Sequence, residues 1–195
     1  MLELPLNMQN TKTVRVFIDT EFTDFINCDL ISFGAVASTG EEFYAENSEY
    51  YKNMASQWVR ENIIPTLNFN KFGMRRLELS ARFWSWLIEL PADEIIITSD
   101  HGIDIDILKE LFQNDSHPKI IGFEVIPQII SREAGTIANH LGTQNNMFPL
   151  VHAFFQKSVD SYFEANSEVR HNALSDARAN KFAWWETCQK YGITL

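Results

Sequence analysis

The segment EIIITS, residues 94–99, is a continuous run rich in β-branched apolar residues. Such a run is typical of a strand that is covered on both faces, because a half-exposed strand shows polar residues at alternate positions. A strand of this kind needs a layer of helices on each side of its sheet. This segment therefore predicts a sheet with helices packed on its faces.

Three more strands are predicted before this run, at residues 14–19, 30–38 and 41–46. Thr39-Gly40 supplies a turn between the second and the third of them. The chain is thus expected to open with an antiparallel meander. KIIGFEVI (119–126) reads as a further strand and its exit after EIIITS.

Helices are predicted between and after these strands. Apolar residues at helical spacing, or compositions that favour a helix, occur at residues 54–62, 80–90, 104–112, 127–141 and 171–191. Ser80 is a candidate N-cap of the second of these helices, and Pro65 follows the first. The expected class is α/β, a mixed sheet flanked by helices. Residues 142–170 receive no assignment, since they combine Gly, Asn and Pro with two aromatic clusters.

Charge and length restrict the function. The chain has 195 residues and is expected to be a single domain, 1–195. A net charge of −10 argues against a broad basic face for duplex nucleic acid, although an enzyme can still bind a short single strand through metal ions. No apolar run reaches about 18 residues, so no membrane span is expected. A cytoplasmic protein with reduced Cys28 and Cys188 is expected, because residues 1–14 lack the pattern of a secretory signal.

Acidic residues stand at the ends of predicted elements in three places. The first is FIDTEF (17–22), where Asp19 and Glu21 are two positions apart and would therefore point to the same face of a strand. The second is SDHGIDIDILK (99–109), directly after the strand at 94–98, and the third is HNALSD (171–176). Two like charges on one strand face repel each other, so Asp19 and Glu21 need a positively charged partner.

Carboxylates that converge from separate segments suit Mg²⁺ or Mn²⁺, which prefer oxygen ligands and keep positions open for substrate. Two such ions can stabilise both the attacking and the leaving oxygen of a phosphodiester. A nearby imidazole can accept the proton of the attacking water at neutral pH. Each motif alone is more often a solvated surface feature, but the three occur together.

These motifs resemble those of the DEDDh group of 3′–5′ exonucleases in the ribonuclease H-like superfamily. The resemblance rests on the strand ending in D-x-E, on an Asp with apolar residues three and four positions later, and on H-x(4)-D followed by Ala. It spans residues 14–180 and implies a mixed sheet with three antiparallel strands followed by parallel ones. The motif-bearing core would cover about 14–190. SQWVRENIIPTL (56–67) and the opening strands resemble a branch of small bacterial and phage exoribonucleases with a mycobacterial member.

The resemblance implies a role for each motif residue. Asp19, Glu21 and Asp176 would be metal ligands, Glu21 would also orient the attacking water, and His171 would be the general base. Asp104 is chosen as the second-motif ligand, because Ile107 and Leu108 follow it at the required offsets. Asp106 is the alternative and Asp100 ranks third. The family often has Asn at the position of Asp100, so this chain carries an added negative charge there.

Substrate contacts are predicted at Thr20, Phe22 and Arg60, with Phe22 either stacking on the terminal nucleotide or packing in the core. The tryptophans are expected to pack within the protein: Trp58, Trp84, Trp86, Trp184 and Trp185. A local basic groove has four candidate arginines: Arg75, Arg76, Arg170 and Arg178.

The expected function is a 3′–5′ exonuclease that uses two Mg²⁺ or Mn²⁺ ions and releases nucleoside 5′-monophosphates. The substrate would be single-stranded or 3′-overhanging nucleic acid, RNA rather than DNA, and relatives suggest a homodimer. Two alternatives remain open: a non-catalytic module that binds nucleic-acid ends or a protein, and a hydrolase of dinucleotides.

Overall fold

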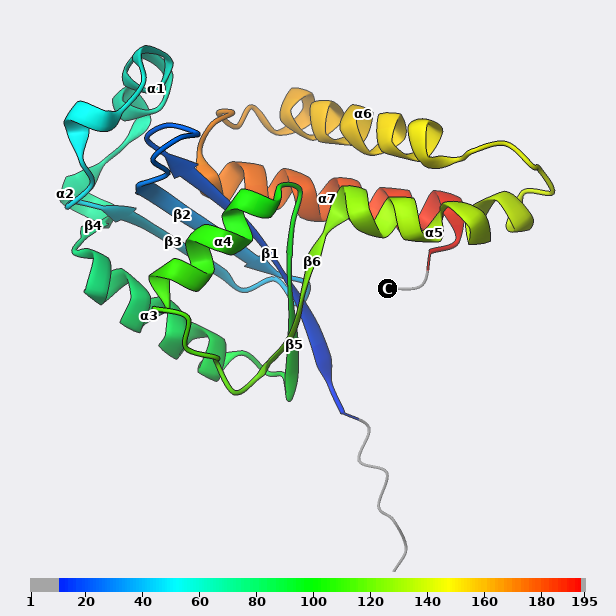
Figure 1. Ribbon diagram of the computed structural model, residues 1–195, viewed down its shortest axis with the longest axis horizontal. Helices are drawn as coiled ribbons and strands as arrows, with labels where there is room; N and C mark the ends of the chain where they lie inside the picture. Colours follow the sequence, from blue (N-terminus) through cyan, green and yellow to red (C-terminus); the bar gives the residue numbers. More distant parts are fainter. Residues whose placement is uncertain (1–10, 194–195) are drawn as a thin grey trace, which may run out of the picture.

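The computed structural model describes residues 11–193, so the expectation for the N-terminal 14 residues falls mostly outside it. Within this range the chain forms a six-stranded sheet of order β4-β3-β2-β1-β5-β6 (Figure 1). The strands are β1 (Thr13–Phe22), β2 (Leu30–Ala37), β3 (Glu42–Asn47), β4 (Gly73–Met74), β5 (Glu94–Ser99) and β6 (Ile120–Val125). The two-residue edge strand β4 was not predicted from the sequence.

β1, β2 and β3 pair with one another in antiparallel order, whereas β5 adds to β1, β6 to β5 and the short β4 to β3 in parallel. The predicted α/β class with a mixed sheet is therefore confirmed. β1 pairs with β5 only from Thr13 to Phe17, whereas its pairing with β2 continues to Phe22. The second half of β1 thus extends beyond the end of β5, and its side chains can meet residues of the segment after β5.

Helices cover both faces of the sheet (Figure 1). One face is covered by α3 (Arg76–Glu89) and α4 (Gly102–Leu111), and the other by α5 (Ile126–His140), α6 (Phe148–Asn166) and α7 (Ala173–Tyr191). Along β1, Val16 and Ile18 pack on the α3 and α4 side, whereas Phe17 packs on the α5–α7 side. By this alternation Asp19 and Glu21 point toward the α5–α7 face.

Two helix predictions need correction, and one short helix was missed. The segment 54–62 is interrupted: a 3-10 turn at Lys52–Met54 is followed by α1 (Gln57–Asn62), because Ser56 caps α1 by accepting a hydrogen bond from the Val59 N–H. α3 begins at Arg76, so Ser80 is not its cap; the Ser80 hydroxyl instead donates to the carbonyl of Leu111. The short helix α2 (Phe69–Phe72) was not predicted.

The unassigned segment 142–170 contains the 19-residue helix α6. Its buried residues Val151 and Phe155 pack with α5 and α7. Polar residues between them hide the helical period in the sequence, which is why the segment gave no clear pattern. No helix within residues 11–193 is both long and apolar enough to cross a bilayer.

Candidate metal and catalytic site

Asp19 and Glu21 stand where β1 extends past β5. In the antiparallel pair with β2 they lie opposite Gly34 and Ser32. Thr20, between them, points to the opposite face, and its side chain is 5% exposed. Both the N–H and the hydroxyl of Thr20 donate to Oδ1 of Asp104, at 3.1 and 2.7 Å. The strand thereby fixes Asp104 beside its own two carboxylates.

Asp104 lies in the first turn of α4. His101 caps the start of this helix, because its Nδ1 atom accepts a hydrogen bond from the N–H of Ile103. Asp104 is buried, with 3% of its surface exposed. Asp106 is turned away from the cluster: its side chain is 78% exposed, and its nearest cation is Lys109 at 4.0 Å. The structure thus brings Asp104 to the cluster and leaves Asp106 outside it.

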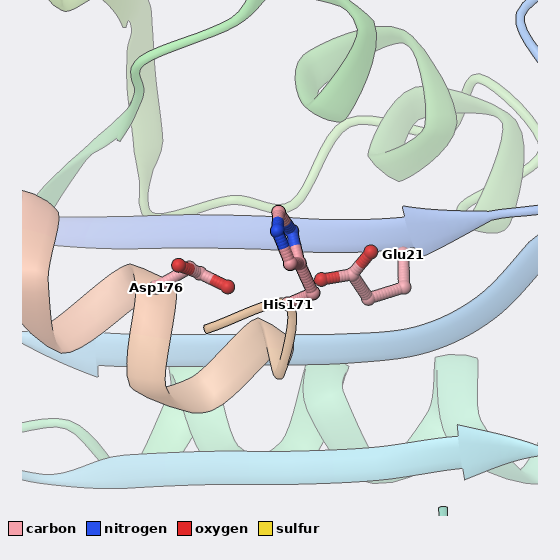
Figure 2. Close-up of side chains that lie close together, drawn as sticks. All are labelled: Glu21, His171 and Asp176. Atoms are coloured by element: carbon pink, nitrogen blue, oxygen red, sulfur yellow. The ribbon is translucent and has the colours of Figure 1, made fainter. Parts of the chain in front are cut away.

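His171 and Asp176 approach from the start of α7 (Figure 2). His171 lies just before the helix with a left-handed backbone (φ 61°), and Asn172 caps the helix by accepting from the N–H of Ser175. This turn places a nitrogen of His171 within 4.8 Å of a carboxylate oxygen of Glu21 and of Asp176. The sequence spacing alone left it open whether His171 and Asp176 meet.

A hydrogen-bond network holds Asn172, the cap residue that follows His171, in place. The Asn172 amide donates to the Tyr44 hydroxyl at 3.3 Å, and that hydroxyl donates to Oε1 of Glu46 at 3.0 Å. Oε1 of Glu46 also accepts from the N–H of Asn68. Glu46 is 1% exposed, so a buried carboxylate on β3 anchors the cap residue of α7. These residues lie in different segments of the sequence, so no local pattern indicated that they meet.

The carboxylates form two groups. In the first, carboxylate oxygens of Asp19, Asp100 and Asp104 all lie within 4.8 Å of one another; in the second, the corresponding atoms belong to Glu21, His171 and Asp176. Asp100 was ranked third in the sequence analysis, yet its carboxylate joins the cluster while that of Asp106 does not.

Burial and mutual repulsion shift the titration of this cluster toward the neutral forms. Burial raises the pKa of Glu21 to about 8, with Asp176 and Asp104 adding to the effect. Burial also raises the pKa values of Asp104 and Asp176 to about 7, and that of Asp19 well above its usual range. Partial burial lowers the pKa of His171, which keeps its imidazole neutral and able to accept a proton at pH 7.

This donor set fits a hard divalent cation. Five carboxylates and one imidazole offer oxygen and nitrogen ligands without a thiolate, which suits Mg²⁺ or Mn²⁺. The raised pKa values of these carboxyl groups agree with this, because they mark a place where buried negative charge lacks a counter-charge that a cation would supply.

The metal-free protein is expected to lose stability between pH 6 and pH 8. Raised carboxyl pKa values mean that the folded state holds more protons than the unfolded state, so this contribution declines as pH rises toward 7–8. Lowered histidine pKa values act in the opposite direction only below about pH 6.5. In EDTA the Tm should fall by about 4 °C or more between these pH values, and Mn²⁺ should restore it.

Thermal unfolding followed by circular dichroism would measure this effect. The Asp19→Asn variant is the control, and its Tm should depend less on pH because it carries less repulsion. A wild-type Tm that rises from pH 6 to pH 8 in EDTA would contradict the prediction.

The residues expected to contact substrate are placed differently from one another. Thr20 is buried and its side chain is committed to Asp104. Phe22 packs against the core and meets the ring of Phe25 edge to face at 5.2 Å. Arg60 is exposed on α1 but two residues from Trp58, so the two side chains leave the helix on different sides.

Trp58 packs as expected, but its packing partner is His171 and not the protein core. Its ring meets the His171 imidazole edge to face at 4.8 Å, and it remains 49% exposed. The N–H of Ser56 donates to the carbonyl of Thr23, which holds the start of α1 next to the end of β1. Trp185 also departs from expectation, since it is 50% exposed, whereas Trp184 is buried.

The candidate arginines are largely neutralised by carboxylates. Three of the four form ion pairs: Arg76 with Asp29 and Glu110, Arg170 with Asp160, and Arg178 with Glu42 and Glu168. Arg75 is the N-cap residue of α3. These pairs leave little free positive charge for a phosphate-binding groove at these positions.

Comparison with known proteins gives a partial match in sequence and a broad match in fold. No family model matches the chain. Two curated relatives, 3′–5′ exoribonucleases from two strains of Mycobacterium tuberculosis, are 44% identical over 55 residues. That stretch is 28% of this chain and 33% of each relative, so the chain spans about a third of the length of the relatives it matches.

Among solved structures, the chain resembles apo Exonuclease I with a TM-score of 0.56 and 15% identity. The likeness covers 92% of this chain and 42% of that one. At this identity it shows the fold, which agrees with the ribonuclease H-like sheet expected from the sequence.

A large cavity lies away from the carboxylates. Its volume is about 940 Å³, and it is lined by residues from the start of β1 and from α7, among them Arg15, Phe17, Lys181 and Trp185. None of the clustered carboxylates lines it. The candidate chemistry therefore belongs to the opposite end of β1.

Proposed function

We propose that this chain is a metal-dependent 3′–5′ exonuclease that acts on single-stranded or 3′-overhanging RNA and releases nucleoside 5′-monophosphates. The observation that carries the proposal is the convergence of Asp19, Glu21, Asp104 and Asp176 with His171 at the end of β1. The fold it shares with Exonuclease I and its 55-residue match to exoribonucleases support the same activity. The preference for RNA rests on those relatives.

The four carboxylates would hold two Mg²⁺ or Mn²⁺ ions. Such ions supply positive charge at the scissile phosphate and lower the pKa of the attacking water. The protein supplies the rest. His171 would accept the proton of that water, since its lowered pKa keeps it neutral at pH 7. Glu21, within 4.8 Å of His171, would orient the water, and Trp58 would limit the motion of the imidazole.

Nearby residues would receive the 3′ end. Phe22, which follows Glu21 in the chain, and the 75% exposed Phe25, whose ring contacts that of Phe22, would offer the apolar surface on which a base can stack. Arg60 is proposed as a more distant phosphate contact. A homodimer stays a prediction. The cytoplasmic setting is also proposed, and the free thiols of Cys28 and Cys188 are consistent with it.

Product analysis is the direct test. Matched RNA and DNA oligomers, labelled at the 5′ end, would be incubated with the protein and Mn²⁺, and the products identified by mass spectrometry. Stepwise shortening of the labelled RNA with release of nucleoside 5′-monophosphates is expected, with slower cleavage of DNA.

Three outcomes would contradict the proposal in different ways. Absence of cleavage would remove the enzymatic function and favour the binding module. Cleavage of a dinucleotide alone would favour the small hydrolase. Faster cleavage of DNA than of RNA would overturn the substrate preference but not the reaction.

A further inference from the structure

We propose that Asp100 is an additional cation ligand in this chain, and that with Asp19 and Asp104 it forms a cation site beside the one formed by the carboxylates of Glu21 and Asp176. The identity of the cation, Mg²⁺ or Mn²⁺, rests on the proposed function. The three carboxylates of the first group approach within 4.8 Å of one another through one oxygen each. They come from β1, from the segment after β5 and from α4.

The sheet register explains why Asp100 arrives there. Phe17 of β1 pairs in parallel with Thr98 of β5, and β5 ends at Ser99. Asp19 and Asp100 each lie two residues beyond this last pair. The same register, continued past the end of β5, places the two residues at one level and on one side of the sheet, which agrees with the approach of their carboxylates.

Neutral donors hold the carboxylates that flank Asp19. The buried side chain of Asn180, on α7, lies beside Asp100 and favours its charged form. Both hydrogen bonds from Thr20 to Asp104 end on Oδ1, which leaves Oδ2 available as a ligand. The hydrogen bonds from Thr20 therefore orient Asp104 before any cation binds.

The three carboxylates lack a cationic side chain as partner. Among the ion pairs found in residues 11–193, none involves Asp19, Asp100 or Asp104. A buried carboxylate without a counter-charge is costly, and a third one placed against two others increases the cost. A divalent cation bound by all three removes that repulsion. Asp100 therefore acts as a ligand and not as a charge that repels substrate.

This arrangement predicts two bound cations in the absence of nucleic acid, one held by Asp19, Asp100 and Asp104 and the other by Glu21 and Asp176. Mn²⁺ would be titrated into the metal-free full chain, with binding followed by calorimetry and free Mn²⁺ counted by electron paramagnetic resonance. The wild type should bind two ions. The Asp100→Asn variant should bind one of them at least about 10-fold more weakly, as expected when a well-oriented oxygen ligand is lost.

Asp106→Asn is the matched control, because Asp106 carries the same group in the same segment but lies exposed outside the cluster. Its Mn²⁺ binding should equal that of the wild type. Unchanged Mn²⁺ binding by Asp100→Asn would overturn the inference, as would a wild type that binds a single ion. Removing a repulsive charge should not lower the Tm in EDTA; if Asp100→Asn is nevertheless misfolded, Asp100→Ser provides the same comparison.

The result separates this inference from the proposed function. Weakened Mn²⁺ binding by Asp100→Asn in a protein that cleaves no RNA would support the site and reject the exonuclease. RNA cleavage by a wild type whose Mn²⁺ binding does not depend on Asp100 would support the exonuclease and reject the ligand role.

Discussion

Replacing Asp19 by Asn is expected to reduce Mn²⁺-dependent RNA cleavage by at least about 1,000-fold. Asp19 is the carboxylate between the two groups: it lies within 4.8 Å of Asp100 and Asp104, and it is close enough to Asp176 and Glu21 for their charges to raise its pKa. Loss of this ligand removes charge stabilisation of several kcal/mol from the transition state, and each 1.36 kcal/mol is a factor of ten. Initial rates on a 5′-labelled RNA would measure the effect.

The same experiment should separate ligands from the proton acceptor. Asp19→Asn should also weaken Mn²⁺ binding in calorimetry. His171→Ala should keep most of that binding but lower the rate by about 100- to 10,000-fold, the usual contribution of a general base. Its fold should be preserved, because His171 is exposed and precedes α7. Full activity of Asp19→Asn would refute the assignment of the site.

Replacing Gly34 by Ala is expected to destabilise the fold by about 2–3 kcal/mol and to reduce activity as well. Gly34 lies on β2 opposite Asp19, where the start of α7 packs directly on the sheet. A Cβ atom at this position would lie 2.3 Å from the backbone carbon and oxygen of Ala173. Backbone atoms cannot move aside as a side chain can, so α7 must shift away from β2.

That shift would move Asp176 and His171, which α7 carries, relative to Asp19 and Glu21. Urea unfolding would measure the stability, and RNA cleavage would measure the alignment. Gly122→Ala on β6 is the matched control, since a Cβ there meets nothing within 4 Å. Its stability should stay within about 0.5 kcal/mol of the wild type. Equal stabilities for the two variants would show that the close approach at Gly34 is not required.

Much of the architecture was predictable because the spacing of apolar residues within each segment indicates its secondary structure. The alternation along β1 indicated that Asp19 and Glu21 share a face, and the apolar run 94–99 indicated a strand covered on both sides. Helix α6 was not predicted, because its own sequence lacks such a clear spacing. Its buried residues are separated by partly buried aromatic residues and exposed polar ones, so the burial that stabilises it is supplied by α5 and α7 and leaves little trace in its own sequence.

The sequence by itself determined which residue types the site contains and the order in which the chain presents them. Only the tertiary structure decided which of them meet. Asp100 joins the cluster because β5 pairs with β1 in one register, Trp58 reaches His171 because Ser56 is bonded to the end of β1, and α7 reaches the sheet because residue 34 has no side chain. These are long-range contacts. They depend on strand register and packing distance, which no single segment of the sequence encodes.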